Sequence, residues 1–196
     1  RLIFNTRCQI AEMFDVWGPE CVAFTSNDTE ALNIALQGTL HPEEETIHAI
    51  CTEMDHNSVL RPLYRLEKKG MELTILPADR KGRISLTELE AAIRPETKVI
   101  VCTHASNLTG NLNDIHAIGE IAQKHQKLFI VDAAQTAGVF PISMKKDHID
   151  ILCFSGHKGL MGPQGTGAIC VRPGVSVEPL KVGGSGVLTF QREHPQ

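Results

Sequence analysis

Apolar residues recur along this chain in two patterns, short continuous runs and helical spacings, and the two patterns alternate. Continuous runs are typical of strands buried on both faces, whereas apolar positions three or four residues apart indicate helices. The runs predict strands at 22–25, 46–51, 73–76, 98–102, 128–131, 149–154 and 167–171. The spacings predict helices at 2–14, 28–38, 86–93 and 114–125, and one that opens at 55–58 and closes at Gly70. This alternation predicts an α/β fold with three layers, α/β/α, around a mostly parallel sheet.

Polar residues and glycines mark where some of these helices begin and end. Asn27 and Ser85 each stand three residues before a glutamate, which resembles a capping box at a helix start. Gly38 is expected to stop the helix that begins at 28. From about Arg172 both patterns fade, and a loop is expected over 181–186.

Composition and charge argue against some classes of protein. The chain has 196 residues, 42% of them hydrophobic, which is enough for a core and for one domain. The net charge is −4 and no basic patch is expected, since Lys68 and Lys69 are explained by a helix C-terminus, so nucleic acid is not an expected partner. The longest apolar stretches are far shorter than the roughly 20 residues of a membrane span, so no membrane contact is expected.

The six cysteines include no C-x-x-C pair, and four of them lie in apolar runs where a thiol acts as a small hydrophobic group. This usage suits a reducing compartment, so we expect a cytoplasmic protein. Cys102 and His104 form the only close pair of zinc-ligand type. Because one pair cannot supply the four ligands of a structural zinc site, no metal is expected.

Polar side chains follow the carboxyl ends of five predicted strands. The five clusters are Asp28 with Thr29, Asp55 with His56, Asn107, Asp132 with Gln135, and Ser155 with His157 and Lys158. Singly, each has an ordinary explanation as a helix cap, a turn former or a solvated side chain. Ligands bind at the carboxyl edge of open α/β sheets, however, and five clusters at that edge favour a binding site.

Lys158 stands at the centre of this set, in a glycine-rich stretch, 155–167, whose backbone can approach another group closely. A lysine amine, a buried acid, an imidazole, an amide and a helix start together are what pyridoxal phosphate chemistry requires. The amine holds the cofactor as a Schiff base, the acid keeps the pyridine nitrogen protonated, and the helix start binds the phosphate. The glycine spacing fits neither a G-x-G-x-x-G motif nor a P-loop, which argues against a nucleotide site.

Five segments make a family resemblance specific. They are 25–33 (TSNDTEALN), 54–60 (MDHNSVL), 103–107 (THASN), 131–135 (VDAAQ) and 154–158 (FSGHK). In sequence, order and interval they resemble the class V aminotransferase and cysteine desulfurase family of fold-type I pyridoxal phosphate enzymes. The resemblance covers essentially the whole chain.

The resemblance implies roles around the cofactor ring. Lys158 would form the Schiff base and move protons at the substrate α-carbon, and His56 would stack on the ring as a second catalytic residue. Asp132 would pair with the pyridinium nitrogen, and Gln135 would donate a hydrogen bond to the ring oxygen. Asn107 would lie beside cofactor and substrate.

The resemblance also implies a phosphate site made of Thr29, Ser155 and His157, with Asp28 beside them. Asp28 is a departure, because the family usually has a small neutral residue at that position. An anion there would repel the phosphate. We therefore expect the Asp28 side chain to turn outward and only its N–H to contribute.

Other parts of the enzyme are expected to lie outside the 196 residues. In this family the desulfurase cysteine and the arginine that binds the substrate carboxylate come well after the lysine. None of the six cysteines fits that role, since five precede Lys158 and Cys170 falls in a strand. Arg1 is not an initiator methionine. We therefore expect 1–196 to be a partial pyridoxal phosphate-binding large domain, without its N-terminal start and without the C-terminal small domain.

Three related activities stay open at this point. The first is cysteine desulfuration, which converts cysteine to alanine and leaves an enzyme-bound persulfide; class V aminotransferase and selenocysteine lyase chemistry are the alternatives. A non-enzymatic alternative is an inactive, truncated binding or interaction module, which predicts damaged site residues, whereas all of them are intact. As partners, the resemblance implies an amino-acid substrate, with cysteine first, a second copy in a homodimer, and a sulfur-acceptor protein.

Overall fold

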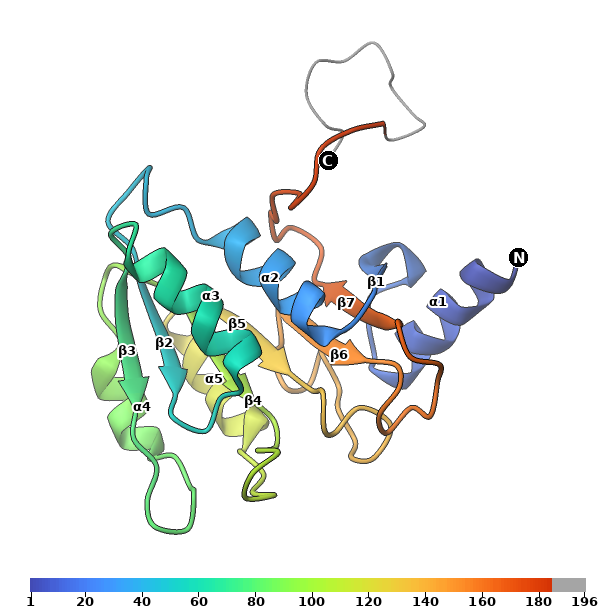
Figure 1. The fold of residues 1–196 in the computed structure, drawn as a ribbon. Helices are drawn as coiled ribbons and strands as arrows, with labels where there is room; N and C mark the ends of the chain where they lie inside the picture. The colour runs from blue at the N-terminus through green and yellow to red at the C-terminus, as the bar shows by residue number, and fades with distance from the viewer. Residues whose placement is uncertain (185–196) are drawn as a thin grey trace.

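The computed structural model describes residues 1–184, so the expected loop at 181–186 falls only partly within it. Strands and helices alternate along the chain as far as β5, and two further strands, β6 and β7, follow without a helix between them (Figure 1). The strands are β1 (Val22–Thr25), β2 (His48–Thr52), β3 (Glu72–Leu76), β4 (Thr97–Thr103), β5 (Leu128–Asp132), β6 (Ile151–Ser155) and β7 (Gly167–Val171). The helices are α1 (Leu2–Met13), α2 (Asp28–Thr39), α3 (Asn57–Glu67), α4 (Leu86–Ala92) and α5 (Ile115–Lys124), with a short 3-10 turn η1 (Pro19–Cys21). Each predicted element is present, with bounds that differ by a few residues.

The strands form one sheet in the order β1-β7-β6-β5-β4-β2-β3. Neighbouring strands from β6 to β3 are parallel, and β7 runs antiparallel to both of its neighbours. Because β7 reverses direction, β1 points the same way as β6. The segments that follow β1, β2, β4, β5 and β6 therefore all leave the sheet at one edge.

Alternate side chains of the central strands pack on opposite faces of the sheet. Val99 and Val101 of β4 belong to a hydrophobic cluster that includes buried residues of α2 and α3. Ile100 and Cys102 belong to a second cluster that includes buried residues of α1, α4 and α5. Because successive side chains of a strand point to opposite faces, the sheet has a hydrophobic core on each face. The predicted three-layer α/β/α architecture with a mostly parallel sheet is confirmed (Figure 1).

Asn27 and Ser85 cap α2 and α4 as expected. The Asn27 Oδ1 accepts from the Glu30 N–H at 2.8 Å, and the Ser85 Oγ accepts from the Glu88 N–H at 3.2 Å. The return contact at α2 differs from a capping box, because the Glu30 Oε2 accepts from the N–H and the hydroxyl of Ser26, one residue before the cap, at 2.7 Å each. Both helix starts are therefore fixed by local side chains.

Gly38 does not stop α2, which continues through it to Thr39. A Cβ at this position would lie 2.6 Å from the Glu178 carbonyl oxygen and 2.6 Å from the Val177 Cγ1. The Glu178 N–H also donates to the Gly38 carbonyl at 2.9 Å. The glycine is thus explained by the close approach of a later segment, which the local pattern could not reveal.

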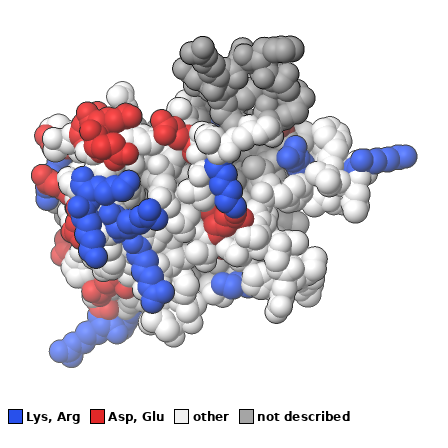
Figure 2. All heavy atoms as spheres, turned by 45° about the horizontal axis from the view of Figure 1, so that its top comes forward, with Lys and Arg blue, Asp and Glu red and all other residues white. Residues whose placement is uncertain are grey.

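The expectation that no basic patch forms is wrong. Arg61 and Arg65 lie exposed on α3, and Lys68 and Lys69 lie exposed just after its last residue, Glu67. Figure 2 shows a cluster of basic side chains on the face that carries this helix. Residues three and four apart share one side of a helix, so cations that form no run in the sequence become neighbours. Separately, none of the helices among residues 1–184 is long and apolar enough to cross a membrane.

Candidate active site

The nine predicted site residues line one cavity of about 160 Å³ at the carboxyl edge of the parallel strands. They come from the segments after β1, β2 and β4, and from the last residues of β5 and β6 with the turns that follow: Asp28, Thr29, His56, Asn107, Asp132, Gln135, Ser155, His157 and Lys158. Asn27, Ser58, Thr103, Ala105 and Ala134 complete the lining. The expected meeting of these side chains at one edge is confirmed.

Two carboxyl groups lie together inside the protein at this cavity. Asp28 is 5% exposed and Asp132 is 2% exposed, and their side chains are within hydrogen-bonding reach of each other. The outward orientation expected for Asp28 is therefore wrong. Its own N–H donates to the Ser155 Oγ at 3.2 Å, which holds the first residue of α2 against the end of β6.

The two carboxyl groups differ in their partners. The Asp132 Oδ1 accepts from the Ala134 N–H at 2.8 Å, whereas the Asp28 Oδ1 is buried with no partner among the described residues. Burial raises the pKa of Asp28 well above its ordinary value, and the charge of Asp132 raises it further, against the opposing effect of Lys158. Burial also raises the pKa of Asp132, but the Ala134 bond and Lys158 oppose that shift. The negative charge therefore stays on Asp132 and the proton on Asp28.

His56 caps α3 with its ring. The His56 Nδ1 accepts from the Ser58 N–H at 3.1 Å and lies 2.8 Å from the Ser58 Oγ. Because Nδ1 is an acceptor here, the neutral ring carries its proton on Nε2. Ser58 was not among the predicted site residues. Its position two residues after His56, at a helix start, was the feature of the sequence that could have identified it.

Asp55, which the sequence grouped with His56, lies behind the cavity wall and does not line it. The Asp55 Oδ2 accepts from the N–H and the hydroxyl of Thr52 at 2.7 and 2.9 Å, and Oδ1 accepts from the Thr103 N–H at 2.5 Å. Burial raises the pKa of Asp55 to about 7, against these hydrogen bonds, which favour the ionised form. Asp55 thus ties the end of β2 to the end of β4 beside His56.

The start of α2 offers hydrogen-bond donors to an anion. The N–H of Glu30 is used by the Asn27 cap and that of Asp28 by Ser155, which leaves the Thr29 N–H without a partner within the described residues. The partial positive charge of a helix N-terminus adds to these donors. Lys158 is exposed and makes no ion pair with any residue in 1–184.

The glycine-rich stretch packs against protein. The Gly156 N–H donates to the Thr166 carbonyl at 2.8 Å, and the Gly162 N–H donates to the Gly156 carbonyl at 2.7 Å. A Cβ at Gly159 would lie 2.5 Å from the Ala137 carbonyl oxygen. The glycines therefore allow the backbone of this stretch to pack closely against itself and against the turn after β5.

Gly167, in β7, supports the start of α2. A Cβ there would lie 2.8 Å from the Asn27 carbonyl carbon and 2.8 Å from the Phe154 carbonyl oxygen. Because both are backbone atoms, Gly167→Ala is expected to lower the free energy of unfolding by about 1–3 kcal/mol. Urea unfolding measures this loss, with Gly183→Ala as control, since a Cβ at Gly183 meets nothing within 4 Å. Equal losses in the two variants would contradict the prediction.

The cysteines are not placed for chemistry at this cavity, since none of the six lines it. Burial raises the pKa of the thiols of Cys51, Cys102, Cys153 and Cys170, in the last case to about 12. These four are protonated thiols at neutral pH and behave as core residues, as expected. Within residues 1–184 no group of three or more His, Cys, Asp or Glu side chains could hold a metal ion.

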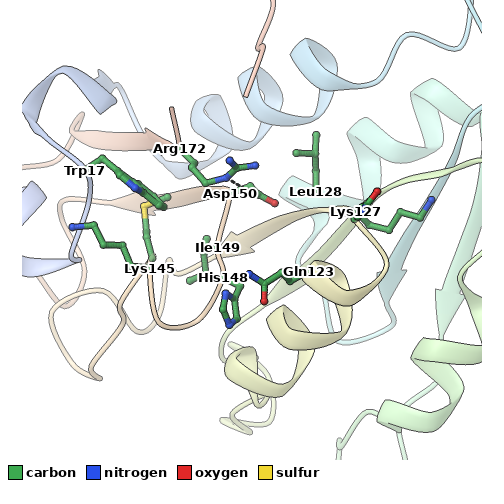
Figure 3. Close-up of a pocket in the computed structure, with 11 residues that line it drawn as sticks. Trp17, Gln123, Lys127, Leu128, Lys145, His148, Ile149, Asp150 and Arg172 are labelled. Atoms are coloured by element: carbon green, nitrogen blue, oxygen red, sulfur yellow. Dashed lines mark hydrogen bonds and ion pairs between the residues drawn. The ribbon is translucent and has the colours of Figure 1, made fainter. Parts of the chain in front are cut away.

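A larger cavity, of about 590 Å³, lies at the opposite edge of the sheet (Figure 3). Its buried acid, Asp150, accepts from the Arg172 Nε at 2.5 Å and from the Phe129 N–H at 2.8 Å. Lys145 pairs with Asp15 at 3.1 Å beside the ring of Trp17. The charges of Asp150 and Arg172, and those of Lys145 and Asp15, neutralise each other. We therefore interpret this cavity as a structural junction of β5, β6 and β7.

A buried acid at the end of one strand, a lysine after the next strand and a helix start facing the same cavity define the class of this protein. It has the large-domain fold of the fold-type I enzymes, which use pyridoxal phosphate. The chain belongs to the aminotransferase class-V family, whose profile matches residues 1–194. The predicted fold class and family are confirmed.

Similar proteins share this fold and much of this sequence. A putative cysteine desulfurase, IscS 1, of Bacillus subtilis is 38% identical over 181 residues, which is 92% of this chain and 47% of that protein. The cysteine desulfurase IscS of Vibrio atlanticus is 38% identical over 92% of this chain and 45% of its own length. The solved structure of SspA in complex with cysteine has a TM-score of 0.88 at 34% identity and covers 93% of this chain and 53% of that one. The chain therefore spans about half the length of the relatives it matches.

Proposed function

We propose that this chain carries the cofactor site of a pyridoxal phosphate-dependent cysteine desulfurase. The observation that carries the proposal is the shared cavity of Lys158, Asp132 and the start of α2. The similarity to two proteins named as cysteine desulfurases, and to a protein solved with cysteine, supports cysteine as the substrate.

The residues present fit this cofactor. An amine free of ion pairs within the described residues, a buried carboxylate and a helix N–H without a partner are three features that a pyridoxal ring and its phosphate would use. Thr29, Ser155 and His157 would bind the phosphate. Asn107 and Gln135 would bind polar groups of the ring and substrate.

Pyridoxal phosphate, when bound, supplies an electron sink for negative charge at the substrate α-carbon. The Lys158 amine anchors the cofactor and moves the proton at the α-carbon. Asp132, ionised and shielded from water, holds a proton at the pyridine nitrogen. His56, fixed by Ser58, would stack on the ring.

The sulfur step needs a cysteine thiolate, and none of the six cysteines lies at the cavity. We place that thiolate in another part of the protein. It attacks the sulfur of the bound substrate, the substrate's carbon–sulfur bond breaks, and Lys158 returns a proton to carbon. The products are alanine and an enzyme persulfide, so atoms and electrons balance. We further propose a cytoplasmic homodimer that passes this sulfur to an acceptor protein.

Borohydride trapping tests the cofactor assignment. The full-length protein is incubated with pyridoxal phosphate, reduced and digested, and the modified lysine is found by mass spectrometry. A pyridoxyl group confined to Lys158 is expected. Labelling scattered over surface lysines such as Lys68 and Lys124, or none, would contradict the site and favour a non-enzymatic module.

Product analysis then separates the related activities. With cysteine, alanine and sulfide released by a reductant are expected in equal amounts. A keto acid formed from the amino acid would favour an aminotransferase. Turnover with selenocysteine but not with cysteine would favour a selenocysteine lyase.

A further inference from the structure

The pair formed by Asp28 and Asp132 is the feature of this cavity that the proposed reaction leaves unused. Both side chains are more than nine-tenths buried and face each other, and neither forms an ion pair within residues 1–184. An ionised carboxylate is only an acceptor, so two carboxyl groups share a hydrogen bond only when one of them carries a proton. Two buried carboxyl groups that line one cavity within reach of each other therefore favour a proton between them.

The surroundings of the pair place that proton on Asp28. The Asp132 Oδ1 has the Ala134 N–H as a donor, while the Asp28 Oδ1 has none among the described residues. Glu30, on the same helix as Asp28, is occupied by Ser26. The other titratable groups around the pair are Lys158, His157, His56, Asp55, Cys102 and Cys153. No hydrogen bond joins any of these six to Asp28 in the described structure.

We propose that Asp28 and Asp132 hold one proton between them, and that the site binds the anionic phosphate of its cofactor only while Asp28 keeps this proton. The proposal rests on the proposed function, because it concerns the same cofactor. Asp28 is the first residue of α2 and lines the same cavity as Thr29 and Ser155, so its ionisation would add negative charge to the cavity that is expected to hold the phosphate. That charge would oppose the helix dipole and repel the ligand.

Cofactor binding then depends on pH through one extra proton. Above the pKa of Asp28, the dissociation constant of pyridoxal phosphate rises about tenfold per pH unit from this group alone. The isosteric variant Asp28→Asn cannot ionise and lacks this dependence. Asp114→Asn, at the N-cap of α5 and outside the cavity, is the matched control, because it makes the same chemical change at the start of another helix.

Equilibrium dialysis of pyridoxal phosphate against the full-length cofactor-free protein, from about pH 6 to about pH 9, measures the effect. The ionisations of the cofactor and of Lys158 are common to all variants and cancel in the comparison. Asp28→Asn is expected to bind more tightly than wild type at the alkaline end, with a gap in dissociation constant that grows about tenfold per pH unit above the pKa of Asp28 and closes toward acid. Asp114→Asn is expected to follow wild type.

Parallel curves for wild type and Asp28→Asn would overturn the proposal while leaving the proposed function standing. Absence of binding in every variant would overturn both. Unfolding of the cofactor-free protein tests the shared proton independently. Because the pKa of Asp28 is raised in the folded state, wild type loses stability as pH rises from about 4 toward that pKa, and Asp28→Asn does not show this loss. Identical pH profiles would show that no proton is shared.

Discussion

Replacing Lys158 by alanine is expected to lower the rate of alanine formation from cysteine by about 10³-fold or more in the full-length protein. The variant loses both the anchor of the cofactor and the group that moves the α-carbon proton, and proton transfer alone typically contributes about 10² to 10⁴. Stability should change little, because Lys158 is exposed and makes no ion pair within the described part of the chain. Steady-state kinetics and urea unfolding measure the two effects separately.

Lys68→Ala is the control for this substitution, since Lys68 is also exposed but lies at the C-cap of α3, away from the cavity. Its activity should match wild type. Added methylamine should restore part of the activity of Lys158→Ala, because a free amine can take over the proton transfer. An equal loss of activity in both lysine variants would show that Lys158 has no special role.

The residues that line the site could be predicted, because residues that follow parallel strands in the sequence all lie at the same edge of the sheet. Residues just after β2, β4, β5 and β6 leave one edge of the sheet, so His56, Asn107, Asp132 and Lys158 had to be neighbours once the strands were recognised. Each strand is an apolar run, which made that recognition straightforward. The caps Asn27 and Ser85 were predictable for a similar reason, since a cap is a contact between residues three apart.

The orientation of individual side chains was not predictable in the same way. Asp28 is buried, and its N–H donates to Ser155, a contact that joins residues far apart in the chain. Gly38 is required by the approach of Glu178. Asp55 looked like a site residue from its place after β2, yet its carboxylate is used by Thr52 and Thr103. Contacts between distant segments decide such cases, and local patterns carry no signal for them.

The edge of the sheet that carries the site is therefore built from two kinds of acid. Asp132 faces the cavity and remains available to a ligand, while Asp55 faces the backbone and fixes the strand ends. The two aspartates have different roles because Asp55 accepts hydrogen bonds from more protein donors than Asp132 does. A carboxylate that accepts three hydrogen bonds from the protein behind the cavity wall is structural, whereas one that lines the cavity and keeps lone pairs unused can act on a ligand.

Replacing Asp55 by alanine is accordingly expected to lower the free energy of unfolding by about 3–5 kcal/mol. The variant leaves three donors, the N–H and hydroxyl of Thr52 and the N–H of Thr103, without their acceptor in a region where Asp55 is 6% exposed. Urea unfolding at about pH 8, above the pKa of about 7, compares variants while the wild-type carboxylate is ionised.

Asp55→Asn keeps one acceptor oxygen and is expected to fall between wild type and alanine. Asp114→Ala removes one hydrogen bond, to the Ala117 N–H at 3.0 Å on the exposed start of α5, and should cost only about 1 kcal/mol. Because Asp55 positions the turn that carries His56, Asp55→Ala should also weaken pyridoxal phosphate binding, whereas Asp114→Ala should not. A loss in Asp55→Ala no larger than that in Asp114→Ala would mean that the strand ends are held by the sheet alone, and that the buried carboxylate is dispensable to the site.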